Sequence, residues 1–161
     1  MSPTTLTLTP YDVARRFLGV REVPGVASNP LVLAMLRLDQ DWPADDSVPW
    51  CSAFTNFVAW LLGLERSRSL AARSWLTVGT PVPLEAAVRG DVVVLTRGAG
   101  KQPGPEVTSG APGHVGFFDR LEGDRVYLLG GNQGNAVTVA PFARSRVLGV
   151  RRLGPEGGRR P

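Results

Sequence analysis

The sequence predicts an α+β fold in which short helices come first and an antiparallel β-sheet follows. In the first half of the 161-residue chain, apolar side chains recur at helical spacing. In the second half they form short β-branched runs separated by turn residues, which is typical of strands. The chain holds 19 glycines and 14 prolines, so we also expect many loops and turns.

Two helices are predicted near the N-terminus from the same start signal. In "TPYDVARRFLGV", Thr9 is a candidate N-cap, Pro10 takes the first helical position and Asp12 lies in the first turn. "SNPLVLAMLRLD" repeats this arrangement with Asn29 as the cap and Pro30 as the first helical residue. Both stretches are therefore expected to be short, capped helices.

Two more helices are predicted before the sheet begins. The stretch "CSAFTNFVAWLLG" follows an acidic segment over residues 39–46 and has an apolar stripe at helical spacing, ended by Gly63. "SLAARSWLTVG" reads as a fourth short helix.

The second half predicts an antiparallel sheet. "GDVVVLTR" indicates a buried strand, and "HVGFFDRLEGDRVYLLGG" indicates two strands joined around "EGD". "NAVTVAPF" and "VLGVRRL" supply two further strands. Residues 98–113, "GAGKQPGPEVTSGAPG", are too rich in glycine and proline to be regular. We expect one domain over residues 1–153 and a disordered basic tail over residues 154–161.

The charge pattern limits the classes of partner. The net charge is +4, Lys101 is the only lysine, and arginines gather toward the C-terminus. Such a balance suits nucleic acid, an anionic membrane surface or an anionic wall polymer, or a merely solvated tail. No helix-turn-helix, zinc-finger spacing or aromatic RNA-binding strand accompanies it, so nucleic-acid binding is not expected.

Membrane insertion is not expected either. No apolar run approaches the roughly 18 residues that a transmembrane helix needs. The opening "MSPTTLTLTPYDVARRF" lacks a basic region followed by an apolar region, so we expect no signal peptide and synthesis in the cytoplasm.

Cys51 is the only cysteine, and it stands directly before an apolar helical stretch. A helix N-terminus stabilises a thiolate, and its free backbone N–H groups can bind an oxyanion. These properties suit a nucleophile. The alternative is a small buried hydrophobe, because Cys51 shares its helical stripe with Phe54 and Val58.

His114 is also the only residue of its type, and it begins a predicted strand directly after the irregular segment. Asn132 follows the next strand, where its amide could orient the imidazole of His114. The same residues also fit a strand-edge histidine and a turn asparagine. One histidine and one cysteine leave a zinc peptidase short of its usual ligands, so a catalytic zinc is not expected.

Five segments carry a resemblance to a known family. "WCSAFTNFVAWLLGL", "ARSWLTVGTPV", "RGDVVVL", "GHVGFF" and "LLGGNQGNAVTVAPF" resemble, in this order, the peptidoglycan-degrading cysteine peptidases of the CHAP and NlpC-type superfamily. The compact phage and prophage lysins are the most similar, over roughly residues 10–153. The resemblance implies a papain-like fold, in which N-terminal helices pack on a small antiparallel sheet.

The resemblance also implies roles for particular residues. Cys51 matches the nucleophile, His114 the general base and Asn132 the third polar residue, while its neighbour Gln133 could take that role or bind substrate. Trp50 and Trp75 are candidates for the substrate groove, although large aromatic residues near a helix start are often in the core. Residues 98–113 are longer than in compact relatives, and either form a wall of the groove or are a surface insertion.

The implied activity is hydrolysis of an amide bond in peptidoglycan, by an endopeptidase or an N-acetylmuramoyl-L-alanine amidase that needs no cofactor. Peptidoglycan is the expected partner, with a holin for release or an immunity protein if the chain is a toxin. We expect a monomer that acts in the periplasm or on the wall after release or injection. The alternatives are a non-catalytic wall-binding or tail-structural relative, and a muramidase that uses carboxylates such as Glu22, Asp45, Asp46 and Asp91.

Overall fold

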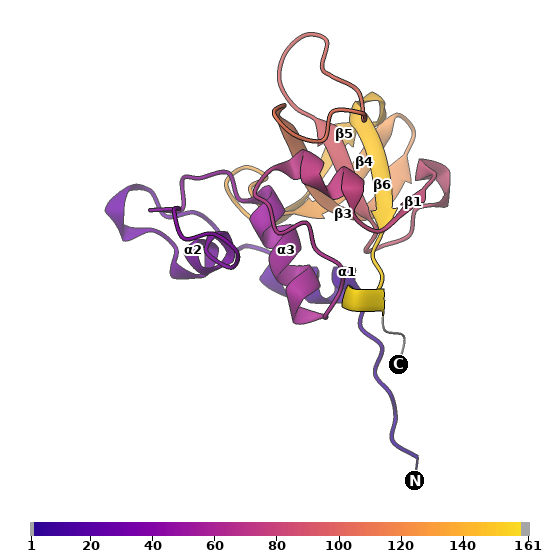
Figure 1. Ribbon diagram of the computed structural model, residues 1–161, viewed down its shortest axis with the longest axis horizontal. Coiled ribbons are helices and arrows are strands. Elements are labelled where there is room, and N and C mark those ends of the chain that lie inside the picture. The colour runs from indigo at the N-terminus through magenta and orange to yellow at the C-terminus, as the bar shows by residue number, and fades with distance from the viewer. Residues whose placement is uncertain (1, 159–161) are drawn as a thin grey trace.

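A six-stranded antiparallel sheet dominates the computed structural model, which describes residues 2–158 (Figure 1). Its strand order is β1-β6-β2-β3-β4-β5, and every neighbouring pair is antiparallel. The strands are β1 (Thr80–Val82), β2 (Val92–Thr96), β3 (Gly113–Glu122), β4 (Arg125–Gly130), β5 (Thr138–Ala143) and β6 (Val147–Arg152). The mixed composition of helices and antiparallel sheet confirms the predicted α+β class.

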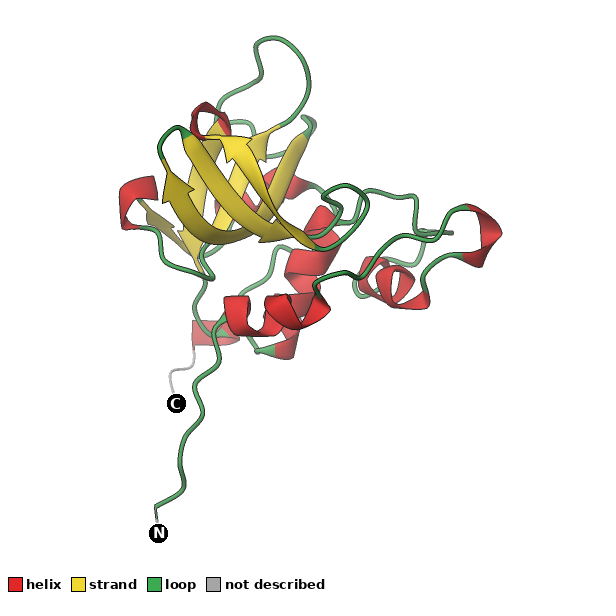
Figure 2. Ribbon diagram, turned by 180° about the vertical axis from the view of Figure 1, so that it is seen from behind, coloured by secondary structure: helices red, strands yellow, loops and turns green. Residues whose placement is uncertain are grey.

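The α-helices lie together on one side of the twisted sheet (Figure 2). They are α1 (Pro10–Ala14), α2 (Pro30–Leu36) and α3 (Cys51–Leu61). Short 3₁₀ turns connect the elements: η1 (Arg15–Phe17), η2 (Gly25–Ala27), η3 (Ala72–Thr77), η4 (Leu84–Ala86), η5 (Arg144–Arg146) and η6 (Glu156–Gly158). No helix within residues 2–158 has both the length and the apolarity needed to cross a bilayer.

The predicted caps of the first two helices are confirmed. Thr9 and Asp12 form a reciprocal capping box at the start of α1, with Thr9 N donating to Asp12 Oδ2 at 2.8 Å. Asn29 Oδ1 accepts from Leu31 N at 2.9 Å at the start of α2. The first helix is shorter than predicted, because it tightens into a 3₁₀ turn after Ala14. The predicted fourth helix is likewise a 3₁₀ helix.

Two apolar clusters hold the sheet, one on each face. Side chains alternate along a strand, so Val115 and Phe117 of β3 face the helices while Phe118 faces the other side. On the helix side, the rings of Phe54 and Phe117 meet edge-to-face with centroids 6.4 Å apart. This packing fixes α3, and with it Cys51, against β3.

The structure also departs from the sequence-based expectations at β1 and near the C-terminus. β1 was not predicted, because a three-residue edge strand that contains Pro81 leaves almost no pattern. The expected disorder from Gly154 onward is wrong for residues 154–158: Gly154 and Glu65 exchange hydrogen bonds, and Glu156 N donates to Gly63 O at 2.9 Å. Residues 159–161, the rest of the expected tail, lie outside the described residues.

Candidate active site

Cys51 is the first residue of α3, and its sulfur is almost completely buried. The backbone N–H groups of Val115 and Ser52 point at the sulfur and favour the thiolate, as does the charge of Arg97. Burial nevertheless outweighs these effects and raises the pKa of the Cys51 thiol. The resting thiol is therefore protonated at neutral pH, in contrast to the thiolate expected from the helix N-terminus.

His114 is the second residue of β3, and its ring lies against Phe142 with centroids 5.2 Å apart. The pKa of His114 is lowered to about 4, mainly by burial and also by the charges of Arg97 and Arg146, against a hydrogen bond to Gln133 that raises it. The imidazole is therefore neutral across the physiological range. A neutral ring is able to accept a proton, which is the state a general base requires.

Gln133 is the hydrogen-bond partner of this ring. Its amide nitrogen donates to Leu128 O at 3.1 Å and to Thr138 O at 2.8 Å, and carbonyl oxygens can only accept. The amide oxygen must then face His114, where Oε1 lies 2.9 Å from Nε2. Nε2 therefore carries the proton and donates it to Gln133, which leaves the lone pair on Nδ1 free.

Asn132 lies beside this pair but makes no hydrogen bond to the imidazole within residues 2–158. Its backbone is in the left-handed region, with φ of 57°, and its side chain lines the same cavity as His114. The ring is hydrogen-bonded to Gln133 instead. The neighbouring glycines make room for it, since a Cβ on Gly130 would lie 2.6 Å from Gln133 Oε1.

Two cavities flank the constellation, and Arg97 lines both of them. One has a volume of about 260 Å³ and is lined by Cys51 together with Pro49, Leu70, Ala71, Ala72, Ala111, Pro112 and Gly113. The other has a volume of about 340 Å³ and is lined by His114 and Gln133 together with Asn132, Gly134, Thr138, Ala140, Phe142 and Arg146. No hydrogen bond joins the thiol to the imidazole in the part of the chain that is described. The two cavities have Arg97 as their common lining residue.

Trp50 and Trp75, the predicted groove residues, are both fully buried. Trp50 Nε1 donates to Glu22 Oε1 at 2.7 Å, and Trp75 Nε1 donates to Ser52 Oγ at 2.9 Å. Both rings pack in the core around the start of α3, so the expectation that they line a groove is wrong. Their N–H groups find buried acceptors, as core tryptophans usually do.

Arg73 is a residue of the site that sequence reasoning missed. Its side chain is fully buried and donates four hydrogen bonds to carbonyl oxygens of the Gly- and Pro-rich segment that precedes His114. The acceptors, at 2.9 to 3.0 Å, are Pro103, Gly104, Val107 and Pro112. The segment projects beyond the sheet (Figure 1), yet carbonyl groups in its middle and near its end are held by this one side chain. Nothing in the sequence separates Arg73 from the chain's many exposed arginines.

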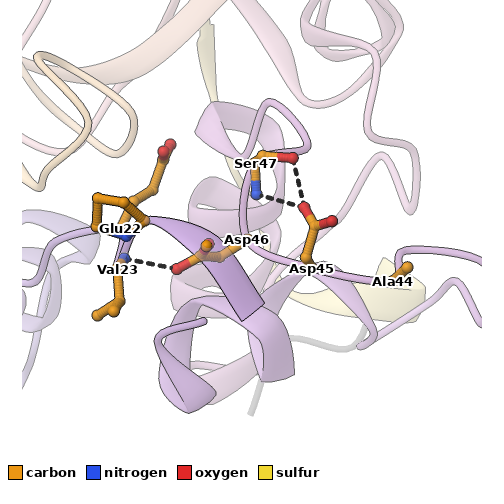
Figure 3. A pocket seen from close by; sticks show the side chains of 8 residues that line it. Glu22, Val23, Ala44, Asp45, Asp46 and Ser47 are labelled. Carbon is orange, nitrogen blue, oxygen red and sulfur yellow. Dashed lines mark hydrogen bonds between the residues drawn. The ribbon is translucent and has the colours of Figure 1, made fainter. Parts of the chain in front are cut away.

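A third cavity, of about 440 Å³, is lined by Glu22, Asp45 and Asp46 (Figure 3). Asp46 accepts hydrogen bonds from Val23 N and Asn29 N, and Asp45 accepts from Ser47 N at 2.9 Å. These carboxylates thus hold the loops before α3 in place. Across residues 2–158, no group of three or more His, Cys, Asp or Glu side chains is arranged to hold a metal ion.

Comparison with known proteins agrees with the fold. No model of a protein family matches the chain, and no curated protein matches it either. Among solved structures, NlpC1 from Trichomonas vaginalis is similar, with a TM-score of 0.50 and 12% sequence identity. The similarity covers 90% of this chain but only 43% of that chain, so this chain spans less than half the length of that relative. The fold is papain-like and of the NlpC type.

Proposed function

We propose that this protein hydrolyses an amide bond of peptidoglycan by thiol chemistry, with Cys51 as nucleophile, His114 as general base and Gln133 as the residue that orients the base. One observation carries the proposal: the hydrogen bonds of Gln133 place the proton of His114 on Nε2, which leaves Nδ1 unprotonated and able to act as a base. The NlpC-type fold supports this class of activity.

The mechanism starts from a neutral pair rather than from a preformed ion pair. His114 Nδ1 takes the thiol proton as Cys51 Sγ attacks the substrate carbonyl carbon. Before this step, burial disfavours a thiolate–imidazolium ion pair. During the attack, backbone N–H groups at the start of α3 donate hydrogen bonds to the negative charge that forms on the carbonyl oxygen. The imidazolium then returns the proton to the amine that leaves, and a thioester to Cys51 remains.

Water completes the reaction. His114 accepts a proton from the water that attacks the thioester carbonyl, and the acid is released as Cys51 regains its proton. Only Cys51, His114 and backbone groups touch the reacting atoms. Gln133 acts through the ring by fixing its tautomer and its direction.

The resemblance of the five sequence segments to compact phage and prophage lysins supports a more specific form of this role. In this form the chain acts on the wall or in the periplasm, after release through a holin pore or after injection as a toxin that an immunity protein restrains. Endopeptidase and N-acetylmuramoyl-L-alanine amidase activity both fit, because the two reactions share the same acyl chemistry.

The carboxylate alternative has less support. A glycosidase needs one carboxylic acid with a raised pKa. Hydrogen bonds from Ser47 instead lower the pKa of Asp45. Asp91 accepts from Arg152 Nε and Nη2, and Glu22 accepts from Trp50. Each carboxylate therefore already has a structural partner.

The test compares the wild type with Cys51→Ala on purified peptidoglycan, with the released muropeptides identified by mass spectrometry. We expect the variant to lose wall hydrolysis while its circular dichroism stays unchanged, because removal of one sulfur atom leaves the rest of α3 intact. Full activity of Cys51→Ala would contradict the thiol mechanism. A wild type that binds peptidoglycan but cuts none would favour the non-catalytic relative.

A further inference from the structure

We propose that Arg97 and Arg146 form a subsite that binds a carboxylate of the substrate beside His114. The inference rests on the proposed function and deepens it, because it names the chemistry that selects the peptide. Neither arginine was singled out for the site by the sequence.

Arg97 is common to the cavities of the two reactive groups. It follows β2 directly, its side chain is exposed, and it lines both the cavity of Cys51 and the cavity of His114. It makes no hydrogen bond or ion pair within the described residues. Its guanidinium therefore presents its donors to whatever occupies these cavities.

Arg146 lines the cavity of His114 as well and is held in place. Its Nε and Nη2 donate to Thr96 O at 3.1 and 2.7 Å, and its guanidinium lies 5.3 Å from the centroid of the Phe142 ring. These contacts anchor Arg146 to the residue directly before Arg97. Nη1 keeps its donors without a partner in residues 2–158.

No carboxylate balances these two charges. Neither cavity is lined by an aspartate or a glutamate, and neither arginine has an acidic partner among residues 2–158. Both charges act on His114, which is buried and neutral. A guanidinium pair beside low-dielectric walls attracts an anion strongly, and its planar forks match the two oxygens of a carboxylate.

The stem peptides of peptidoglycan carry such carboxylates, so we commit to a peptide carboxylate rather than to a phosphate. The carboxylate must lie close to the bond that is cut, because Arg97 lines the cavities of both reactive groups. Amidation of that carboxylate removes its charge and one of its acceptor oxygens. The enzyme should therefore discriminate against amidated peptides.

The experiment uses pairs of synthetic stem peptides that carry either a carboxylate or a carboxamide at the same position. Binding is measured by calorimetry in Cys51→Ala, which cannot turn the peptides over, and cleavage is measured in the wild type. We expect roughly tenfold or greater preference for the carboxylate in both measurements. We expect Arg97→Met and Arg146→Met to abolish the preference, mainly through KM.

Arg144→Met is the matched control, because Arg144 lies two residues from Arg146, pairs with Glu85 and lines neither cavity. It should keep the full preference. Equal binding of both peptides by Cys51→Ala, or an equal loss on both peptides in Arg97→Met, would overturn the subsite while leaving the hydrolase intact. Selective binding without cleavage by the wild type would confirm the subsite and refute the proposed function.

Discussion

Arg73 Nε donates a hydrogen bond of 2.9 Å to the carbonyl oxygen of Pro112, two residues before His114. The other nitrogens of the same guanidinium hold three more carbonyls of the segment. A fully buried positive charge is thus satisfied by neutral acceptors alone. The loss of any of these hydrogen bonds would expose the protein to the free-energy cost of an unsatisfied buried charge. The strand that carries the base begins at this fixed point.

Replacement of Arg73 by lysine should destabilise the protein although the charge is kept. A lysine ammonium has three donors on one atom and cannot span the four carbonyls that the planar guanidinium reaches. We expect a loss of about 2–4 kcal/mol in the free energy of unfolding, measured in denaturant. Arg125→Lys, at an exposed position, should stay within about 0.5 kcal/mol. Equal effects in the two variants would show that the buried guanidinium is not an anchor.

The pKa of His114 is directly measurable, because the chain holds a single histidine. Burial lowers this pKa to about 4 in the folded protein, against about 6.5 for an unfolded chain. The unfolded state therefore binds more protons between these values, and stability rises with pH over this window by about 3 kcal/mol. Imidazole NMR signals should titrate near pH 4, and His114→Asn should lose this part of the pH dependence. Titration near 6.5 would contradict the buried, neutral ring.

Alkylation of Cys51 tests the protonation state of the thiol. The chain has one cysteine, so mass spectrometry after iodoacetamide treatment reports on one site. Because burial raises the pKa of this thiol, we expect slow modification at neutral pH and a steep increase above pH 9 without unfolding. The opposite result, rapid alkylation at pH 6, would indicate a preformed thiolate and an ion pair with His114.

Gln133 and Asn132 offer a matched pair of neighbours. Gln133→Leu removes the acceptor for His114 Nε2 and should reduce kcat by roughly 10² or more, with little change in KM. Asn132→Ala should leave kcat within a few-fold of the wild type. Gln133→Glu keeps an acceptor and adds a negative charge, so it should raise the pKa of His114, visible by NMR. Loss of kcat in Asn132→Ala alone would assign the orienting role to Asn132.

Gly131 should tolerate no side chain. A Cβ at this position would lie 2.7 Å from Phe54 Cβ and 2.7 Å from the Trp50 ring. Gly131→Ala must therefore push on the start of α3, and we expect a loss of about 1–3 kcal/mol and reduced activity. Thermal unfolding of both variants measures the loss. Gly154→Ala is the control and should have a small effect, because the nearest contact of its Cβ would be at 3.4 Å.

Local signals predicted much of the fold. The caps Thr9 and Asn29 depend on neighbours within three residues, and the β-branched run of β2 indicates its strand without help from the rest of the chain. β1 has no such signal, because its pairing with β6 is entirely long-range. Local propensity therefore predicts elements whose own residues favour the helix or strand. It does not predict a strand such as β1, which forms only because it pairs with a distant strand.

The site was predictable in its types of residue and less so in its geometry. Unique occurrence singled out Cys51 and His114, but the choice between Asn132 and Gln133 depends on a left-handed turn that only the folded chain displays. Burial reverses the pKa shift that the helix N-terminus alone suggests for Cys51. Arg73 and Arg97 look alike in the sequence. Only the structure shows that Arg73 is a buried anchor and that Arg97 is an exposed residue of the cavities.

The amide of Gln133 is held by Leu128 of β4 and by Thr138 of β5, and β5 forms the outer edge of the sheet. An edge strand opens at lower free energy than the centre of a sheet. Warming should therefore release the proton-directing amide while the strands around Val94 remain intact. Turnover would then fade at a temperature below the melting transition seen by circular dichroism, and it would return in full on cooling.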